Sequence, residues 1–380
     1  MPDILLNIGT NDWFWQSCFP EEGNARIWLS HYPYSDFQIL LAKDGVDYLY
    51  PRWSPSGNQF AYVESIPILV PEGAEIPTSV DEGVSVWVQD QAGNRRRVSD
   101  VLPRINFGQA DTCGPATYVL SPPLWSPDEQ KIVFAYTDRF SSKIDYYMID
   151  LNTGATHLFD SDSMYGGAYE NPVWINSNQL ALVSGKNTFK IFDGTGKEVQ
   201  KIEPPADLLK IIQEPRVYAL QLSGEKLLVG FTENKVARKA VWYLLDATSG
   251  VWERVLDVSK MNVGFPYAVD SQIVACETHA LTVFDEQWQV VGRNSALPAL
   301  PDECSDSFQF DGFQLFEYEH RIFASYPGAT EGNRKRGIWA MVIQRRAPQP
   351  ELLVDLSNPP ETMRWAYTLV IDYSWRIPDR

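Results

Sequence analysis

The sequence is poor in the residues that build metal and redox sites. Only 4 cysteines and 4 histidines occur among its 380 residues. The cysteines form no C-x-x-C pair, and the histidines show none of the H-x-x-x-H or H-E-x-x-H spacings of zinc hydrolases. A chain of this length buries a sizeable core without disulfides. We therefore expect no metal, no cofactor and no disulfide framework.

Basic residues and long apolar runs are also scarce. The chain has 32 Lys and Arg against 49 Asp and Glu, which gives a formal net charge of −17. Affinity for nucleic acids depends on Lys and Arg that neutralise phosphates, so this balance predicts no nucleic-acid partner. No stretch approaches the roughly 18 consecutive apolar residues of a transmembrane helix, and we expect no insertion into a membrane.

The amino-terminal segment differs from a signal peptide. Residues 1–15 contain Asp3 and Asp12, and they include neither a basic region nor a small-residue cleavage site. These features favour a cytoplasmic protein. A mature exported chain would begin in the same way, so the sequence is compatible with both locations.

Aromatic residues, glycine and proline are abundant. The chain has 13 Trp, 18 Tyr and 18 Phe, together with 24 Gly and 26 Pro. Aromatic side chains pack well on pleated, half-buried surfaces, and glycine and proline are typical of tight turns. The composition therefore predicts a packed all-β protein with many turns.

An internal repeat supports this prediction. The segment Pro51–Val63 contains Trp-Ser-Pro-Ser-Gly followed by an apolar run, and it recurs at residues 123–136 and, more weakly, at 172–183. The repeat is marked by Trp53, Pro55, Gly57, Trp125, Pro127, Asp128 and Trp174. Proline fixes φ at about −65° and glycine tolerates positive φ, so each copy predicts a strand, a tight turn and a second strand.

A second hairpin follows each copy of the repeat. Turn residues at 91–94, 152–154 and 194–196 separate apolar or aromatic runs. Two hairpins give four strands in a period of about 45–50 residues, which is what one blade of a β-propeller requires.

The repeat motif resembles the WD-like repeat of TolB-type β-propellers. Two copies match well, a third matches in part, and the later units agree in period. The resemblance implies a single propeller domain of four-stranded blades over residues 1–380. It leaves the function open, because this family includes accessory, scaffold and peptidase-linked propellers.

The chain ends predict how the propeller closes. Residues 25–43 form one hairpin of a blade, and residues 363–375 supply its missing strand or strands. Pairing of the two ends removes the exposed edges of an open ring. Six internal units and this composite blade give seven blades, and six is the alternative if the last internal unit is misread. Residues 1–20 receive no assignment.

The long connections between strands all lie at one end of the predicted blades. They are Ser65–Gly83, Asp100–Pro122, Asp160–Asn171, Glu203–Arg216, Thr232–Ala240, Leu297–Gly312 and Pro327–Arg336. Loops on a rigid scaffold often bind ligands, so we predict that this long-loop face binds a protein or peptide partner. Its candidate contact residues are Phe107, Tyr118, Tyr165, Tyr169, Glu170, Lys235, Arg238, Arg334, Lys335 and Arg336. The alternative is that these loops are solvated insertions without a partner.

No catalytic motif accompanies the repeats. The nucleophile motif G-x-S-x-G is absent, so the chain has no fused α/β-hydrolase and no assigned catalytic residue. We predict a non-catalytic interaction module or scaffold. Two alternatives stay open. One is a hydrolase or lyase that acts on a saccharide or small ligand at the channel through Asp111, Asp160, Glu170 or Asp270. The other is a structural subunit of a larger complex. The sequence assigns neither the partner nor the oligomeric state.

Overall fold

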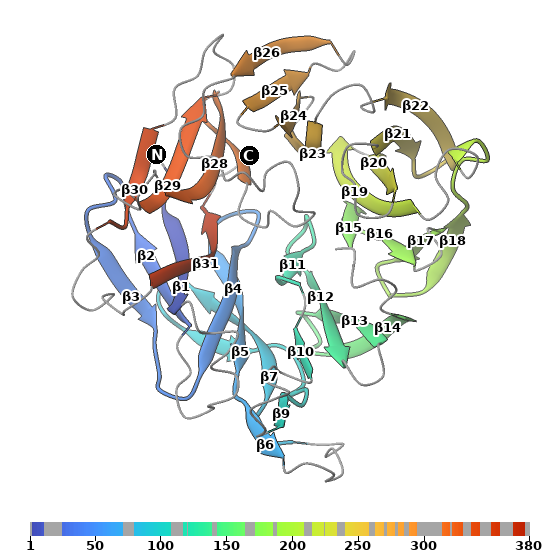
Figure 1. Cartoon of the computed structure of the whole chain (residues 1–380). Coiled ribbons are helices and arrows are strands. Elements are labelled where there is room, and N and C mark those ends of the chain that lie inside the picture. The colour runs from blue at the N-terminus through green and yellow to red at the C-terminus, as the bar shows by residue number, and fades with distance from the viewer. Residues whose placement is uncertain are drawn as a thin grey trace. The chain divides into compact units, whose positions relative to one another are not determined.

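The structure is a computed structural model of the whole chain (Figure 1). It describes residues 2–10, 25–70, 80–107, 117–119, 121–138, 143–163, 172–184, 188–208, 215–223, 225–233, 240–257, 263–269, 272–277, 280–284, 289–294, 314–319, 321–329, 336–342, 351–357 and 368–376. The chain divides into two compact units, the first comprising Met1–Tyr169 with Pro359–Arg380 and the second Glu170–Asn358.

The first unit contains three antiparallel sheets and one small parallel sheet. One sheet has the order β3 (Phe37–Leu41), β2 (Arg26–Ser30), β1 (Ile4–Thr10), β31 (Thr368–Trp375). The next is β4 (Asp47–Trp53), β5 (Gln59–Ser65), β7 (Val84–Asp90), β8 (Arg95–Arg97). The third comprises β10 (Thr117–Val119), β12 (Lys131–Asp138), β13 (Lys143–Asp150) and β14 (Thr156–Ser163), with β11 (Leu124–Trp125) also paired to β12. The parallel sheet pairs β6 (Ile68–Val70) with β9 (Ile105–Phe107).

The second unit contains four sheets of four consecutive strands each among its described residues. The first comprises β15 (Val173–Asn176), β16 (Gln179–Ser184), β17 (Thr188–Asp193) and β18 (Glu198–Ile202), and the second comprises β19 (Pro215–Ser223), β20 (Lys226–Glu233), β21 (Ala240–Asp246) and β22 (Val251–Asp257). The third comprises β23 (Val263–Val269), β24 (Gln272–Glu277), β25 (Ala280–Phe284) and β26 (Val290–Asn294). The fourth comprises β27 (Gln314–Tyr318), β28 (Arg321–Ala329), β29 (Arg336–Val342) and β30 (Glu351–Asp355). The predicted all-β class and the predicted four-stranded antiparallel unit are both confirmed.

The first sheet combines strands from both ends of the chain, but its composition differs from the prediction. The amino-terminal part contributes three strands and the carboxy-terminal part contributes one, because β1 lies between β2 and β31. The sequence assigned no strand to residues 1–20. From Ile4 to Ile8 every residue is buried, so β1 shows no alternation of apolar and polar residues that would reveal a strand. Asn7 is buried within this run, and its side-chain amide donates to the carbonyl of Tyr48 over 2.7 Å.

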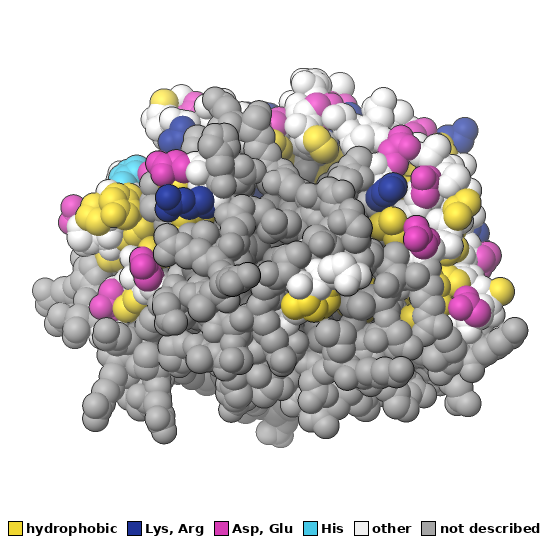
Figure 2. All heavy atoms as spheres, turned by 90° about the horizontal axis from the view of Figure 1, so that it is seen from above, with side chains coloured by type: hydrophobic (Ala, Val, Ile, Leu, Met, Phe, Trp, Pro, Cys, Tyr) yellow, Lys and Arg dark blue, Asp and Glu magenta, His cyan; other side chains and the backbone are white. Residues whose placement is uncertain are grey.

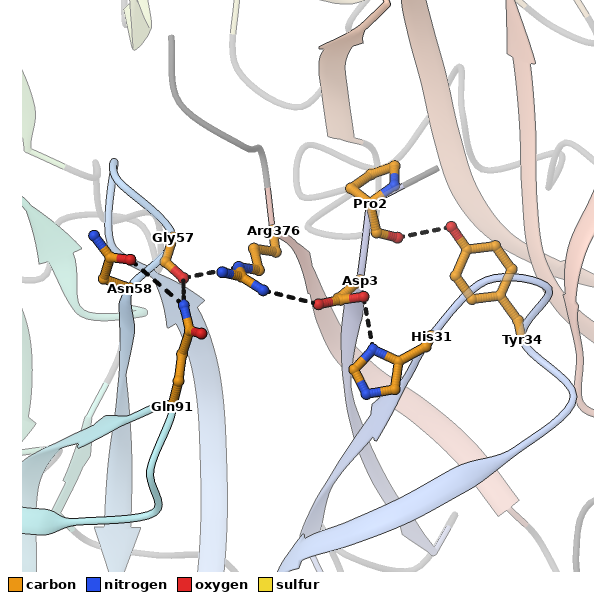
Figure 3. A network of polar contacts seen from close by, with 8 residues as sticks. All are labelled: Pro2, Asp3, His31, Tyr34, Gly57, Asn58, Gln91 and Arg376. Carbon is orange, nitrogen blue, oxygen red and sulfur yellow. Dashed lines mark hydrogen bonds and ion pairs between the residues drawn. The ribbon is translucent and has the colours of Figure 1, made fainter.

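Polar contacts join the chain ends to the neighbouring sheet (Figure 3). The guanidinium of Arg376, just after β31, lies 3.1 Å from the carboxylate of Asp3, just before β1. The other carboxylate oxygen of Asp3 lies 2.7 Å from His31 Nδ1. Arg376 Nε also donates to the carbonyl of Gly57, which accepts a second bond from the Gln91 side chain. These contacts connect β1 and β31 to the two short turns of the sheet that contains β4.

The tryptophan repeat forms the predicted turn and also links two sheets. In the first copy, Gly57 has a φ of +69° and its N–H donates to the carbonyl of Ser54. Glu129 takes the place of this glycine in the second copy, with a φ of +59°. The indole of Trp125 donates to the carbonyl of Arg52 over 3.0 Å. The repeat therefore fixes both a turn and the contact between sheets.

A second turn motif recurs at the end of the third strand in four sheets. The residues are Asp90 of β7, Asp150 of β13, Asp193 of β17 and Asp246 of β21. Each carboxylate accepts backbone N–H bonds of 2.8–3.1 Å from residues two to four positions later. A glycine with a φ between 71° and 86° completes each turn. Hydrogen bonds from the turn lower the pKa of all four carboxyls.

This motif predicts a loss of stability in acid. The folded-state pKa of Asp150 lies below its unfolded value, so its contribution is complete at neutral pH and is lost as the pH falls through the folded-state pKa. We expect Asp150→Asn to lower Tm by roughly 1–2 °C at pH 7. The difference from the wild type should shrink towards about pH 2, where both side chains are neutral. Thermal unfolding followed by circular dichroism measures both effects, and a difference independent of pH would contradict the assignment.

Candidate functional site

The two long connections of the sheet β4–β5–β7–β8 lie at the same end of that sheet. One joins β5 to β7 over residues 66–83, and the other leaves β8 at residue 98. The short turns at residues 54–58 and 91–94 lie at the opposite end, because neighbouring strands are antiparallel. In Figure 1, β6 and β9 lie together beyond the ends of β5 and β7. This end of the sheet is the candidate functional site.

The described parts of these two connections are paired as strands. Ile68 pairs with Ile105 and Val70 with Phe107 in the parallel sheet β6–β9. At its base, Val84 and Leu102 exchange two backbone hydrogen bonds of 2.7 and 2.8 Å. Gly83 is needed there, because a Cβ at this position would lie 2.3 Å from the carbonyl oxygen of Leu102. The predicted loops therefore contain an ordered extension, which we call the β6–β9 extension.

A buried ion pair attaches this extension to the sheet. Arg104 directly precedes β9 and is 3% exposed. Its Nη1 lies 2.7 Å from Oδ2 of Asp47, the first residue of β4, and donates to the hydroxyl of Ser65, the last residue of β5, over 2.8 Å. The other oxygen of Asp47 accepts from the backbone N–H of Ala25 over 3.1 Å. Arg104 therefore crosses the ends of two strands and holds the connection against them.

Backbone contacts on either side strengthen this attachment. The carbonyl of Arg104 accepts from the N–H of Ile68 over 2.8 Å, which joins the two connections directly. The hydroxyl of Tyr136, in β12 of the next sheet, donates to the carbonyl of Pro103. The extension is thus fixed to two sheets of the first unit.

Three of the predicted contact residues lie in strands. Phe107 ends β9, Tyr118 is in β10 opposite Thr137, and Arg336 begins β29. These residues therefore lie in β structure and not in irregular loops, and their role in binding a partner stays a prediction. β9 and β10 contact each other, which brings the segments of Phe107 and Tyr118 together. Tyr165, Tyr169, Glu170, Lys235, Arg238, Arg334 and Lys335 lie outside the described residues, and their role stays a prediction.

Of the four carboxylates named for an alternative active site, the structure describes one. Asp160 lies in β14, opposite Tyr146. Asp111, Glu170 and Asp270 fall outside the described residues. In the part of the chain that is described, no group of three or more His, Cys, Asp or Glu side chains has the arrangement of a metal site. Among the described residues, no helix is long and apolar enough to cross a membrane.

Sequence reasoning missed the residues that hold the extension. Arg104 stands between Pro103 and Ile105 in a connection that was predicted to be a long surface loop, and Asp47 is 57 residues away along the chain. A signal was available, since an arginine flanked by apolar residues and followed by a short β-branched and aromatic run suggests burial with a partner. The identity of that partner depends on the order of the strands in the sheet, in which β4 and β8 are the two edges.

The ion pair gives a test of this arrangement. Arg104→Met removes the cation and leaves the carboxylate of Asp47 buried without it, which should cost about 3–5 kcal/mol of unfolding free energy. The double variant D47N/R104M should recover part of that loss, because the amide of Asn carries no charge and still accepts from Ala25. Urea unfolding measures both values. Equal stability of the single and double variants would show that the charge of Asp47 is not what Arg104 neutralises.

Comparisons with known proteins give likenesses in structure. No protein family model matches the sequence, and no curated protein matches it. Similar solved structures include TolB from Acinetobacter baumannii, with 13% identity, 76% of this chain and 62% of that chain covered, and a TM-score of 0.40. The C-terminal WD40 domain of Sif2 has 9% identity, coverages of 85% and 76%, and a TM-score of 0.46. Oligogalacturonate lyase from Vibrio parahaemolyticus has 11% identity, coverages of 91% and 90%, and a TM-score of 0.49.

The chain thus spans less than two thirds of the length of the TolB structure. The repeat motif resembles that of TolB-type propellers, and a TolB and a WD40 domain are among the structures that the chain resembles. They include an enzyme as well. At identities of 9–13%, these likenesses assign no activity or partner to the chain.

Proposed function

We propose that this chain is a non-catalytic interaction module, which binds a protein or peptide partner through the long connections at one end of its sheets. We further propose that its sheets form one seven-bladed propeller, closed by the pairing of β1 with β31, and that it acts in the cytoplasm. The observation that carries the proposal is the β6–β9 extension with its buried Arg104.

A loop that only joins one strand to the next does not need a buried ion pair such as that of Arg104 and Asp47. A guanidinium and a carboxylate lose their hydration when they are buried, and hydrogen bonds to Ser65 and Ala25 are needed to offset that cost. The ion pair and its hydrogen bonds thus hold the backbone of the β6–β9 extension in place at the end of the sheet. Binding to such a preformed surface avoids much of the entropy cost of ordering a loop.

The residues predicted for the long-loop face suit a polypeptide partner. The predicted contact residues combine aromatic rings with charges of both signs. Aromatic residues are enriched in protein interfaces, and complementary charges orient partners as they meet. The excess of carboxylates in the chain speaks against a nucleic acid as the occupant.

Affinity purification from the native source with quantitative mass spectrometry tests the proposed surface. In the test variant, residues 71–79 and 108–116 are replaced by Gly-Ser sequences of equal length. In the control variant, Asn58 and Ala92, in the short turns at the opposite end, are changed to Ser. We expect the test variant to lose at least about 90% of a specific partner and the control to retain it. Circular dichroism verifies that both are folded. Retention of all partners by the test variant would contradict the proposal.

A separate test addresses the basic segment Arg334–Arg336 of the second unit. Reversal of Arg334, Lys335 and Arg336 to Glu should weaken capture of the partner by about tenfold, if these charges face acidic groups on it. The matched control reverses three exposed cations of the same unit, Lys197, Lys226 and Arg321. An equal loss in both triple variants would mean that total charge, and not this loop, governs capture.

A further inference from the structure

The outer strands of the described sheets each contain or end in a register shift, and in β8 the shift follows its three arginines. In the described residues, β3, β14, β18, β22, β26 and β30 each pair with their neighbour through a register shift of one residue. β8 pairs with β7 in continuous register over Arg95, Arg96 and Arg97. Bulges twist an edge away and interrupt its hydrogen-bonding groups, which discourages the addition of another strand. In β8 the shift lies at the end of the strand, where the N–H groups of Val98 and Ser99 both donate to the carbonyl of Val86. Arg95, Arg96 and Arg97 therefore form an uninterrupted edge of three residues.

The backbone of β8 has two residues whose polar groups point away from the sheet. In the ladder between β7 and β8, hydrogen-bonded pairs alternate with pairs that are not hydrogen-bonded. The Asp90 N–H donates to the Asn94 carbonyl, and the Val98 N–H donates to the Val86 carbonyl, so both of these pairs are hydrogen-bonded. Val88 and Arg96, midway between them, form the next hydrogen-bonded pair. The N–H and C=O groups of Arg95 and Arg97 therefore face outward. Within the described chain these outward groups have no hydrogen-bond partner.

The side chains make this edge positively charged. Arg95 is held in place, since its Nε donates to the Tyr62 hydroxyl over 2.7 Å, its Nη2 lies 3.1 Å from Glu64, and its guanidinium lies over the Trp87 ring. Arg96 and Arg97 are exposed and form no ion pair with any described residue. In the view of Figure 2, the Lys and Arg side chains lie as separate groups with Asp and Glu side chains near them. Arg95, Arg96 and Arg97 are three consecutive cations in a chain of net charge −17.

We propose that β8 is a docking edge for an acidic, extended segment of a partner protein, which adds to the sheet as a further strand. Charge complementarity selects this occupant. The outward backbone groups of Arg95 and Arg97 would pair with the added strand, and its carboxylates would face Arg96 and Arg97. A second copy of this chain is disfavoured at this edge, because it would place arginine opposite arginine. A nucleic acid would use the guanidinium groups but leave the outward backbone groups unpaired.

This edge is a surface additional to the β6–β9 extension, so the inference goes beyond the proposed function. Its test leaves both long connections unchanged. Failure here would therefore not affect the proposed function, and failure of the loop replacements would not affect β8.

The experiment uses the full-length chain and a capped synthetic peptide, acetyl-Val-Glu-Glu-Glu-Val-Thr-amide. Hydrogen exchange of single amides is followed by NMR. We expect saturating peptide to slow exchange at Arg95 and Arg97 by about tenfold or more and to leave Arg96, which is already bonded, little changed. The same peptide with Gln in place of Glu should bind about tenfold more weakly. A peptide with N-methyl groups on the glutamates that face β8 cannot form the ladder and should give no protection.

A matched pair of protein variants completes the test. R96E/R97E should bind the acidic peptide at least about tenfold more weakly, whereas K43E/R321E, with the same change in net charge, should bind like the wild type. Absence of protection at Arg95 and Arg97, equal binding of the N-methylated peptide, or equal weakening in both variants would each overturn the proposal. Tighter binding of single-stranded oligodeoxythymidine than of the peptide would overturn it in favour of nucleic acid. Circular dichroism verifies that the variants are folded, and the N-methylated peptide tests the wild-type chain directly.

Discussion

The buried ion pair between Arg104 and Asp47 is the interaction on which the candidate surface depends. Asp47 begins one edge strand of its sheet, and Arg104 lies in the connection that leaves the other edge strand. The pair therefore ties the two edges together at the end that carries the long connections. Bonds to Ser65 and Ala25 offset the desolvation of both charges. With Arg104 fixed, its carbonyl meets Ile68, and the two connections become one ordered extension.

The two ends of this sheet use their polar groups differently. At the end with short turns, the carbonyl of Gly57 accepts from both Gln91 and Arg376, and the carboxylate of Asp90 accepts from its own turn. That end joins the chain termini and stabilises the fold. At the opposite end, the hydrogen bonds of Arg104 to Asp47 and Ser65 fix the β6–β9 extension to the sheet. The same sheet thus has one end joined to the chain termini and one end that carries the extension for which we propose a binding role.

The sequence was informative where the structure is local. Hairpins were predictable because Trp-Ser-Pro turns and glycine turns are fixed by neighbouring residues. β1 was missed because the run from Ile4 to Ile8 is buried throughout and shows no strand periodicity. The β6–β9 extension was missed for another reason. Its parallel pairing joins residues 37 positions apart, and its anchor joins Arg104 to Asp47, so neither follows from a local pattern.

Hydrogen exchange of the chain alone and in complex with a partner recovered from the native source tests the central claim most directly. The account predicts that the partner slows exchange in residues 66–70 and 102–107, the described part of the extension and its anchor. It also predicts unchanged exchange in the turns at residues 54–58 and 91–94. Protection confined to those turns, with no change in the extension, would contradict the claim that the anchored connections form the binding surface.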